Sequence, residues 1–414
     1  MTSVQSLSEL TALIYQVRSA TASLALSESV SAALLLVAKE LDAARDAIFD
    51  ANTLDLEASL EMAVPDLVID WLKLTPDRLH LAIETLRNLA HVSLPPHVSP
   101  SMGLPTRHPI TQAHQWQPLG VIAFVYEAFP EFAIIAAGLC LRTGNGLILK
   151  GGNEASQTNL AIAQVFADAL DQADISPALI QSISPSDGES ARRWLMQSTD
   201  LDLIIPYGRA SLVNQVMREA HSPVLATAIG NCYLYWGVSA EAETVARFVI
   251  DSHASTPDPV NGIEKVLIHA DMPEPAIGEL VRRLREANLT AKRHVGVLYE
   301  GQIPQDAEAL AAASLNGTVM LISVDRLDTA IALMNTYSSG HANAIATESY
   351  PEVRQFTQRA CSSTLYVNTS PRFMRNPPQA AEIALGMSAQ RGLTSGRIGL
   401  DTLLSRQRVV HGLG

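Results

Sequence analysis

Residues 150–154 place a lysine, two glycines and a carboxylate in one short turn between a predicted strand and a predicted helix; their sequence is Lys-Gly-Gly-Asn-Glu. Glycines at such a turn allow backbone N–H groups to approach a phosphate or a ribose, and Lys150 adds a positive charge. A tight turn that binds nothing would use the same residues, because the chain has neither GxGxxG nor GxxxxGK[ST]. The turn alone leaves ligand contact and a purely structural role open.

The three cysteines, Cys140, Cys232 and Cys361, lie far apart and form no CxxC pair. This spacing excludes a disulfide scaffold and a zinc module, and it favours a reducing cytoplasm. A reactive thiol needs an electropositive, partly exposed environment. Cys140 falls inside an apolar helical run, Cys232 begins a predicted strand, and Cys361 has a single arginine nearby. We therefore predict structural roles for all three.

Two groups of ionisable side chains are better explained by solvent exposure than by a ligand. Histidines in and beside a proline-rich segment have no acidic or cysteine partner, whereas a metal needs several converging ligands. Arginines on one helical stretch indicate a solvated face more often than an anion site. The side chains are His91, His97, His108 and His114, and Arg282, Arg283 and Arg285. We predict no metal site.

The elements that position these residues follow from the hydrophobic pattern. The first 90 residues have apolar positions at helical spacing. Residues 92–118 contain six prolines and are predicted to form an extended connection or arm. Short apolar runs then alternate with helical ones, and the runs are apolar throughout, as in a parallel sheet covered on both faces. This βαβ pattern predicts an α/β fold with open sheets of the dinucleotide-binding kind.

Strands are expected in two series, separated by a domain change near residue 228, with a return to the first domain after about residue 360. The expected strands span residues 121–125, 146–149, 179–183, 201–205, 232–236, 266–269, 318–323, 344–346 and 364–367.

Length, composition and charge exclude several classes of protein. The chain has 414 residues, more than the roughly 250–300 that one core usually serves, so two or more domains are expected. Hydrophobic residues make up 47% and charged residues 17%, which excludes a disordered chain. The net charge of −13 argues against nucleic-acid or anionic-membrane partners. No apolar stretch approaches the roughly 20 residues of a membrane helix, and the amino-terminal residues do not resemble a signal peptide.

Several short segments, distributed in order along nearly the whole chain, match the pattern of a known family. They read Pro-Leu-Gly-Val-Ile at 118–122, Tyr-Glu-Ala at 126–128, Gly-Asn-Gly-Leu-Ile-Leu-Lys-Gly-Gly-Asn-Glu-Ala at 144–155, Asp-Leu-Ile-Ile-Pro at 202–206, Gly-Asn-Cys at 230–232, Asn-Gly-Ile-Glu-Lys-Val-Leu-Ile-His at 261–269, Ser-Gly-His at 339–341 and Val-Asn-Thr-Ser-Pro-Arg-Phe at 367–373. Together they resemble the γ-glutamyl phosphate reductase family, a branch of the aldehyde dehydrogenase superfamily.

The resemblance implies an aldehyde-dehydrogenase-like fold with two α/β domains, open parallel sheets and an oligomerisation arm. The expected divisions are 1–227 for the amino-terminal helices and nucleotide-binding domain with the 92–118 arm, 228–360 for the catalytic-type domain, and 361–414 for the return segment and carboxy-terminal arm. The implied reaction is NADPH-dependent reduction of L-glutamate 5-phosphate to L-glutamate 5-semialdehyde, in proline biosynthesis in the cytoplasm. The implied partners are a substrate of the glutamyl phosphate type and further copies of the chain.

The family's chemistry begins with attack of a cysteine thiolate on the acyl phosphate. In the family that cysteine precedes the asparagine matched by Asn261, and here the preceding residue is Val260. Valine has no nucleophilic atom. We expect Val260 to lie on a loop in the cleft between the two domains.

Other departures from the family fall in the same reactive and substrate-contact stretches. Arg-Pro-Asn is replaced by Phe-Pro-Glu at 129–131, and the carboxylate of Glu131 would oppose a developing oxyanion. Further replacements are Ala-Thr-Ala at 226–228, Arg-Asn-Pro-Pro at 375–378 and Leu-Thr-Ser-Gly at 393–396. We therefore predict that the chain is inactive in the family reaction. The alternatives are a silent homologue that binds nucleotide, regulates or joins an active homologue in a hetero-oligomer, and a different reaction on the same scaffold.

The resemblance places cofactor contacts in the turn at residues 150–154 and just after the strand expected at residues 201–205. The expected contacts are Lys150, Gly151, Gly152, Glu154 and Gly208. In the family's Ile-Pro-Arg-Gly-Gly the arginine corresponds to Tyr207, and the nearest arginine here is Arg209, two places along. We expect NADPH binding, where retained, to be weakened and to depend mainly on Lys150.

Overall fold

The computed structural model describes residues 2–22, 24, 28–93, 99–101, 110–184, 187–376, 383–389 and 396–412. The chain divides into two compact units. Unit 1 comprises Met1–Ala226, Asn376–Leu385 and Ile398–Gly414, and unit 2 comprises Thr227–Arg375 and Gly386–Arg397. Each unit is described by itself.

The amino-terminal part is helical, as predicted. Its helices are α1 (Leu7–Ala22), α2 (Glu28–Ala43), α3 (Arg45–Glu61), α4 (Asp66–Leu72) and α5 (Pro76–His91). Helix α5 begins where the Thr75 hydroxyl accepts a hydrogen bond from the N–H of Arg78 and where Pro76 occupies the first turn.

Unit 1 is built on a four-stranded parallel sheet in the order β5-β4-β3-β6. Its strands are β3 (Val121–Tyr126), β4 (Gly146–Lys150), β5 (Ile180–Ser182) and β6 (Leu203–Tyr207). Every residue of β3, β4 and β6 is buried, because helices cover both faces of the sheet. The connecting elements are α6 (Pro130–Thr143), η1 (Asn153–Ala155), α7 (Ser156–Gln172), η2 (Pro177–Leu179), α8 (Gly188–Gln197) and α9 (Ala210–Glu219).

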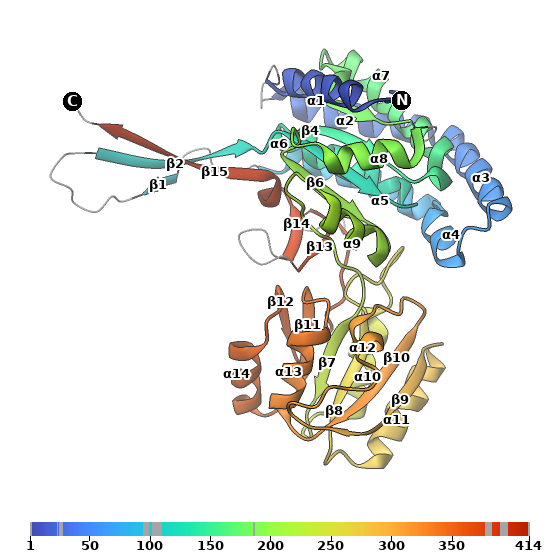
Figure 1. The fold of residues 1–414 in the computed structure, drawn as a ribbon, viewed down its shortest axis with the longest axis vertical. Coiled ribbons are helices and arrows are strands. Elements are labelled where there is room, and N and C mark those ends of the chain that lie inside the picture. The colour runs from blue at the N-terminus through green and yellow to red at the C-terminus, as the bar shows by residue number, and fades with distance from the viewer. Residues whose placement is uncertain are drawn as a thin grey trace. The chain divides into compact units, whose positions relative to one another are not determined.

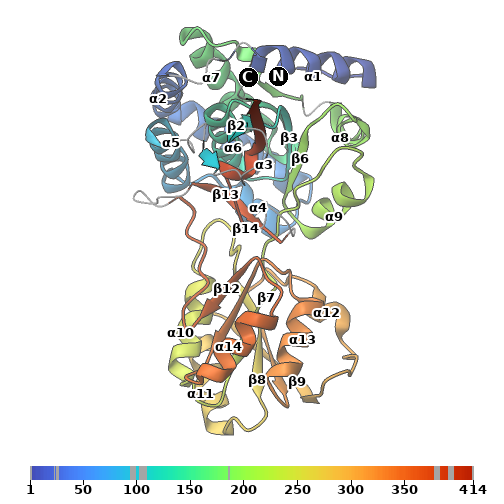
Figure 2. The ribbon, with the colours of Figure 1, turned by 90° about the vertical axis from the view of Figure 1, so that its left-hand side faces the viewer.

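Unit 2 contains a six-stranded parallel sheet in the order β12-β11-β7-β8-β10-β9. Its strands are β7 (Cys232–Trp236), β8 (Ile263–His269), β9 (Thr290–Leu298), β10 (Thr318–Val324), β11 (Ala342–Ala346) and β12 (Thr364–Val367). Helices α10 (Ala242–Ser252) and α11 (Glu274–Glu286) pack on one face, and α12 (Ala307–Ala311), α13 (Leu327–Tyr337) and α14 (Tyr350–Arg359) on the other (Figures 1 and 2). The predicted α/β class with open parallel sheets is confirmed.

Within the two parallel sheets, one strand was not expected from the sequence. Strand β9 lies at the edge of the unit 2 sheet and is mostly exposed. It carries Lys292, Arg293 and His294 in place of an apolar run, so its pattern does not resemble that of the covered strands.

The remaining strands include an antiparallel group that projects as a long ribbon in Figure 1. Its members are β1 (Ser99–Ser101), β2 (Ile110–Pro118) and β15 (Leu404–Gly412). A two-stranded sheet joins β13 (Ala384–Ser388) and β14 (Gly396–Gly399), and η4 (Asp401–Leu403) precedes β15. The described part of the proline-rich segment is thus extended, while the prolines at 95, 96, 105 and 109 lie outside the described residues. Within the described ranges, no helix is long and apolar enough to cross a membrane.

Candidate functional site

The turn after β4 borders a polar cavity of about 190 Å³ in unit 1. Four of the predicted cofactor contacts line this cavity: Lys150, Gly151, Gly152 and Glu154. The cavity wall also includes Glu127, Arg192 and Arg209, which the sequence did not identify as site residues. Three cations and two carboxylates therefore face one small space.

The two glycines make room for neighbouring side chains in and beside the turn. A Cβ atom at Gly151 would lie 2.3 Å from the Asn159 amide nitrogen, and one at Gly152 would lie 2.0 Å from the Glu154 carboxylate. The Lys150 ammonium is buried and donates to the Gly151 carbonyl at 2.8 Å. The glycines alone are therefore no evidence for a ligand, and any binding capacity lies in the cavity and its charges.

The Glu154 carboxylate points back to the turn after β3. Its Oε1 accepts a hydrogen bond from the N–H of Ala128 at 2.7 Å. Ala128 has a φ of +53°, a conformation uncommon for a residue with a side chain, so this bond stabilises an unusual turn. Burial raises the pKa of the Glu154 carboxyl, and the neighbouring Glu127 carboxylate raises it further.

The fifth predicted contact, Gly208, is not part of the cavity wall but lies against one of its members. With a φ of +149°, it directly follows β6, and a Cβ atom there would lie 2.7 Å from Glu127 Oε2. The same Glu127 carboxylate accepts two side-chain hydrogen bonds and one backbone hydrogen bond from Arg209. Arg209, the arginine displaced from the family position, therefore lies at the cavity. Its carboxylate partner, Glu127, lies 82 residues earlier in the sequence and was not predicted.

In unit 2, Val260 lies in a turn before β8 and is fully buried. Its carbonyl oxygen accepts hydrogen bonds from the N–H of Gly230 and from Nε2 of His341, both at 2.8 Å. The Asn261 amide donates to the Pro371 carbonyl at 2.8 Å. The loop location agrees with the sequence-based expectation, while a position between the two domains stays a prediction.

None of the three thiols lies in an activating environment. Cys232 Sγ is 3.3 Å from His341 Nε2, but both side chains are fully buried. Burial raises the pKa of the Cys232 thiol and lowers the pKa of His341 to about 4. Burial also raises the pKa of Cys140, and Cys361 is exposed. Among other hydroxyls near Val260, Ser255 donates to the Phe373 carbonyl at 2.7 Å.

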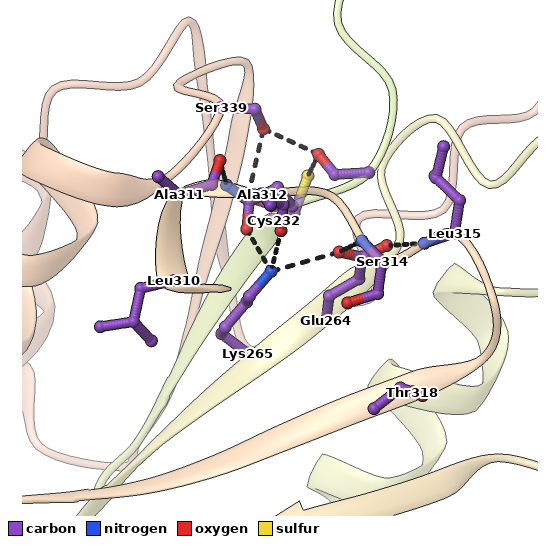
Figure 3. A network of polar contacts seen from close by, with 12 residues as sticks. Cys232, Glu264, Lys265, Leu310, Ala311, Ala312, Ser314, Leu315, Thr318 and Ser339 are labelled. Atoms are coloured by element: carbon purple, nitrogen blue, oxygen red, sulfur yellow. Dashed lines mark hydrogen bonds and ion pairs between the residues drawn. The ribbon is translucent and has the colours of Figure 1, made fainter. Parts of the chain in front are cut away.

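A buried polar network fixes the turn that contacts Val260 (Figure 3). The Lys265 ammonium donates to Asn231 Oδ1 and to the Ala312 carbonyl, each at 2.5 Å. The adjacent Glu264 carboxylate accepts from the N–H groups of Ser314 and Leu315 at 2.7 and 2.8 Å. Burial lowers the pKa of Lys265. Because Gly230 and Asn231 both have positive φ, this network holds an unusual backbone beside position 260.

The Glu131 carboxylate is paired within the protein, which the sequence did not predict. Its carboxylate forms a two-point ion pair with the guanidinium of Arg78, with Nε–Oε1 and Nη2–Oε2 distances of 2.7 Å, and both side chains are buried. Arg78 also donates to the carbonyls of Trp71 and Lys73. The negative charge that the sequence placed near a developing oxyanion is therefore compensated by helix α5.

Further replaced positions have partners of their own. Phe129 stacks on Trp71 with ring centroids 4.6 Å apart and meets the Tyr207 ring edge-on at 5.4 Å. Arg375 forms a buried ion pair with Asp258 at 2.8 Å. The replacements at 377–378 and 393–395 lie outside the described residues.

The solvated face expected for the arginines of helix α11 is observed at Arg282. Arg282 is exposed and pairs with Glu279 and Glu286 on its own helix. His91 and His114 are described, whereas His97 and His108 are not. Among the described residues, no three histidine, cysteine or carboxylate side chains are placed to hold a metal.

Comparisons with known proteins identify the family. No family model matches the chain. The γ-glutamyl phosphate reductase 2 of Synechocystis sp. is 41% identical over 394 residues, covering 92% of this chain and 91% of that protein. The crystal structure of γ-glutamyl phosphate reductase from Thermotoga maritima superposes with a TM-score of 0.85 at 26% identity, covering 98% of both chains. A probable aldehyde dehydrogenase from Listeria monocytogenes shares the fold, with a TM-score of 0.71 at 15% identity over 99% of this chain and 97% of its own. This chain belongs to the γ-glutamyl phosphate reductase family and has an aldehyde-dehydrogenase-like fold.

Proposed function

We propose that this chain binds a nicotinamide nucleotide, NADPH by family resemblance, in the unit 1 cavity but does not carry out the family's acyl-phosphate reduction. The observation that carries the proposal is the buried valine at the position of the family nucleophile. Thioester formation needs an atom that donates an electron pair to the acyl carbon as phosphate leaves, and the Val260 side chain has none.

The partners of the replaced residues support the loss of catalysis. A single valine could be repaired by one mutation, but Glu131 is paired with Arg78, and Phe129 is stacked on Trp71. Arg375 is likewise paired with Asp258. Where the family resemblance implies polar contacts with substrate, the replaced side chains contact other side chains of the protein. The substitutions therefore form a self-consistent packing arrangement that no longer depends on a substrate.

The charges of the cavity support nucleotide binding. Lys150, Arg192 and Arg209 line it, and cations of these types bind phosphate by charge-assisted hydrogen bonds. Lys150 and Gly151 stand where the resemblance places the nucleotide. When bound, the nucleotide would supply hydride chemistry, whereas the residues of the cavity would hold its phosphates and ribose.

A second candidate is an intact reductase, favoured by 41% identity to a protein named as one. It would require another nucleophile. Cys232 is fully buried beside a histidine that donates to a backbone carbonyl, and Ser255 already donates to a carbonyl. Neither arrangement activates the group for attack.

Two assays on the purified protein test the proposal. We expect no L-glutamate 5-semialdehyde-dependent reduction of NADP⁺ in the presence of phosphate, and we expect calorimetry to detect NADPH binding that Lys150→Ala weakens. Turnover of about 1–1000 per second would overturn the silent assignment. The absence of heat at millimolar NADPH would limit any binding free energy to about −4 kcal/mol and remove the cofactor function.

A silent member could act through other chains. The antiparallel ribbon of β2 and β15 matches the arm through which the resemblance implies oligomerisation, so we propose a homo-oligomer or a mixed oligomer with an active homologue. Co-expression with an active homologue and light scattering of the purified material distinguish these assemblies from a monomer.

A further inference from the structure

Arg209 and Glu127 form a two-point ion pair on the wall of the cavity. Glu127 Oε1 accepts from Arg209 Nη2 at 2.9 Å, and Oε2 accepts from Nε at 3.2 Å and from the Arg209 backbone N–H at 2.9 Å. The Arg209 side chain is 43% exposed, so a ligand entering the cavity can reach the guanidinium.

These donors are the kind that bind phosphate. A guanidinium fork and a backbone N–H recognise carboxylate and phosphate oxygens with the same planar, two-point geometry. Lys150 and Arg192 line the same cavity and add positive charge. The anion that Arg209 holds is the Glu127 carboxylate of the protein itself.

The cavity is small for a ligand-binding site. Its volume of about 190 Å³ is smaller than the roughly 300–1000 Å³ of typical ligand pockets. The absence of a side chain at Gly208 leaves room for the Glu127 carboxylate, because a Cβ atom there would lie 2.7 Å from Glu127 Oε2. Movement of Glu127 away from Arg209 would enlarge the cavity and free three hydrogen-bond donors together.

We propose that Arg209 is the phosphate contact of the nucleotide site and that Glu127 occupies this contact until a ligand phosphate replaces it. Glu127 is thus an internal competitor that lowers affinity for phosphate-bearing ligands. The inference rests on the proposed function, since it assigns the residues by which a nucleotide is recognised in that cavity.

Calorimetric titration of NADPH into wild type and Glu127→Gln tests this competition. Removing the carboxylate charge should tighten NADPH binding by about two- to fivefold, the scale of a partly exposed ion pair. In an Arg209→Ala background the same Glu127→Gln change should give no gain, because no guanidinium remains to be released. Adenosine, which has no phosphate, should bind the two proteins equally.

Asp42→Asn is the matched control. It removes a carboxylate that pairs with another part-exposed arginine of unit 1, Arg87, and that does not line the cavity. We expect this control to change the NADPH affinity by less than about twofold. Thermal melts verify folding, and Glu127→Asp provides a second variant, since its shorter side chain withdraws from Arg209 while keeping the charge.

The outcomes separate this inference from the proposed function. Equal NADPH affinities for wild type, Glu127→Gln and Glu127→Asp would overturn the competition and leave nucleotide binding intact. A gain that persists with Arg209→Ala, or that Asp42→Asn reproduces, would show a general charge effect and also overturn it. No binding by any variant at millimolar NADPH would overturn nucleotide binding and the competition together.

Discussion

The carbonyl oxygen of Val260 accepts a hydrogen bond from the Nε2–H of His341 at 2.8 Å. A carbonyl can only accept, so Nε2 must carry the proton. The same nitrogen is 3.3 Å from Cys232 Sγ, and a protonated Nε2 cannot take a proton from that thiol. The only histidine beside Cys232 among the described residues therefore holds the backbone in place and does not act as a base.

This arrangement predicts that Val260→Cys alone does not restore reductase activity. The side chain at 260 is fully buried, and His341 Nε2 is committed to the carbonyl of that residue. The new thiol would therefore lack both exposure and a base. The measurement is semialdehyde-dependent reduction of NADP⁺ by the purified variant. Activity with this single change would show that the altered surroundings tolerate catalysis.

His341 also predicts a pH dependence of stability. Burial lowers its folded-state pKa to about 4, while the unfolded value is near 6.5. The unfolded chain therefore binds more protons between these values, so His341 contributes stability above pH 6.5 that is lost as the pH falls toward 4. The loss between pH 7.5 and pH 5.5 should be about 1 kcal/mol.

Urea unfolding at the two pH values measures this effect, with His341→Gln as the control. Glutamine can still donate to the Val260 carbonyl but does not titrate. The variant should have a flatter pH profile by about the same 1 kcal/mol. Identical profiles for the two proteins would assign the pH dependence to other groups.

Thiol accessibility provides a test of the cysteine assignments. In the native protein one thiol, that of Cys361, should react with a water-soluble disulfide reagent, because Cys140 and Cys232 are buried. Unfolding should expose all three. Cys361→Ser should abolish the native reaction, and fast native labelling of Cys232 would reopen the possibility that it is a nucleophile.

Within the two parallel sheets, the hydrophobic pattern predicted the covered strands well and the exposed strand not at all. Strands β3 and β4 are apolar along their whole length because helices cover both faces, and that signal is local. Strand β9 has one partner strand and a charged, exposed surface, so nothing in its residues separates it from a loop. Its place in the sheet depends on pairing with β10.

The candidate site was predicted only where its residues are neighbours in sequence. Lys150 and Glu154 were expected from one turn, and both line the cavity. Two ion pairs that the sequence did not predict join residues far apart along the chain: Glu127 and Arg209 by 82 residues at the cavity, and Arg78 and Glu131 by 53 residues away from it. Such pairings arise from the fold, and a single sequence gives no signal for them.

The Arg78–Glu131 pair gives the largest expected change in stability. Arg78→Met would leave the Glu131 carboxylate buried without its partner, at a cost of about 3–5 kcal/mol. Combining it with Glu131→Leu removes both charges, and the double variant should recover part of that loss, because an apolar pair often replaces a buried ion pair at little cost. The remaining loss comes from the Trp71 and Lys73 carbonyls, which no longer have Arg78 as a donor. The measurement is the free energy of unfolding in urea for wild type, both single variants and the double variant.

Arg87→Met, which removes a half-exposed ion pair with Asp42, serves as the control and should cost about 1 kcal/mol or less. If the two single losses simply add in the double variant, Glu131 is not held by Arg78, and its charge is again available to oppose an oxyanion.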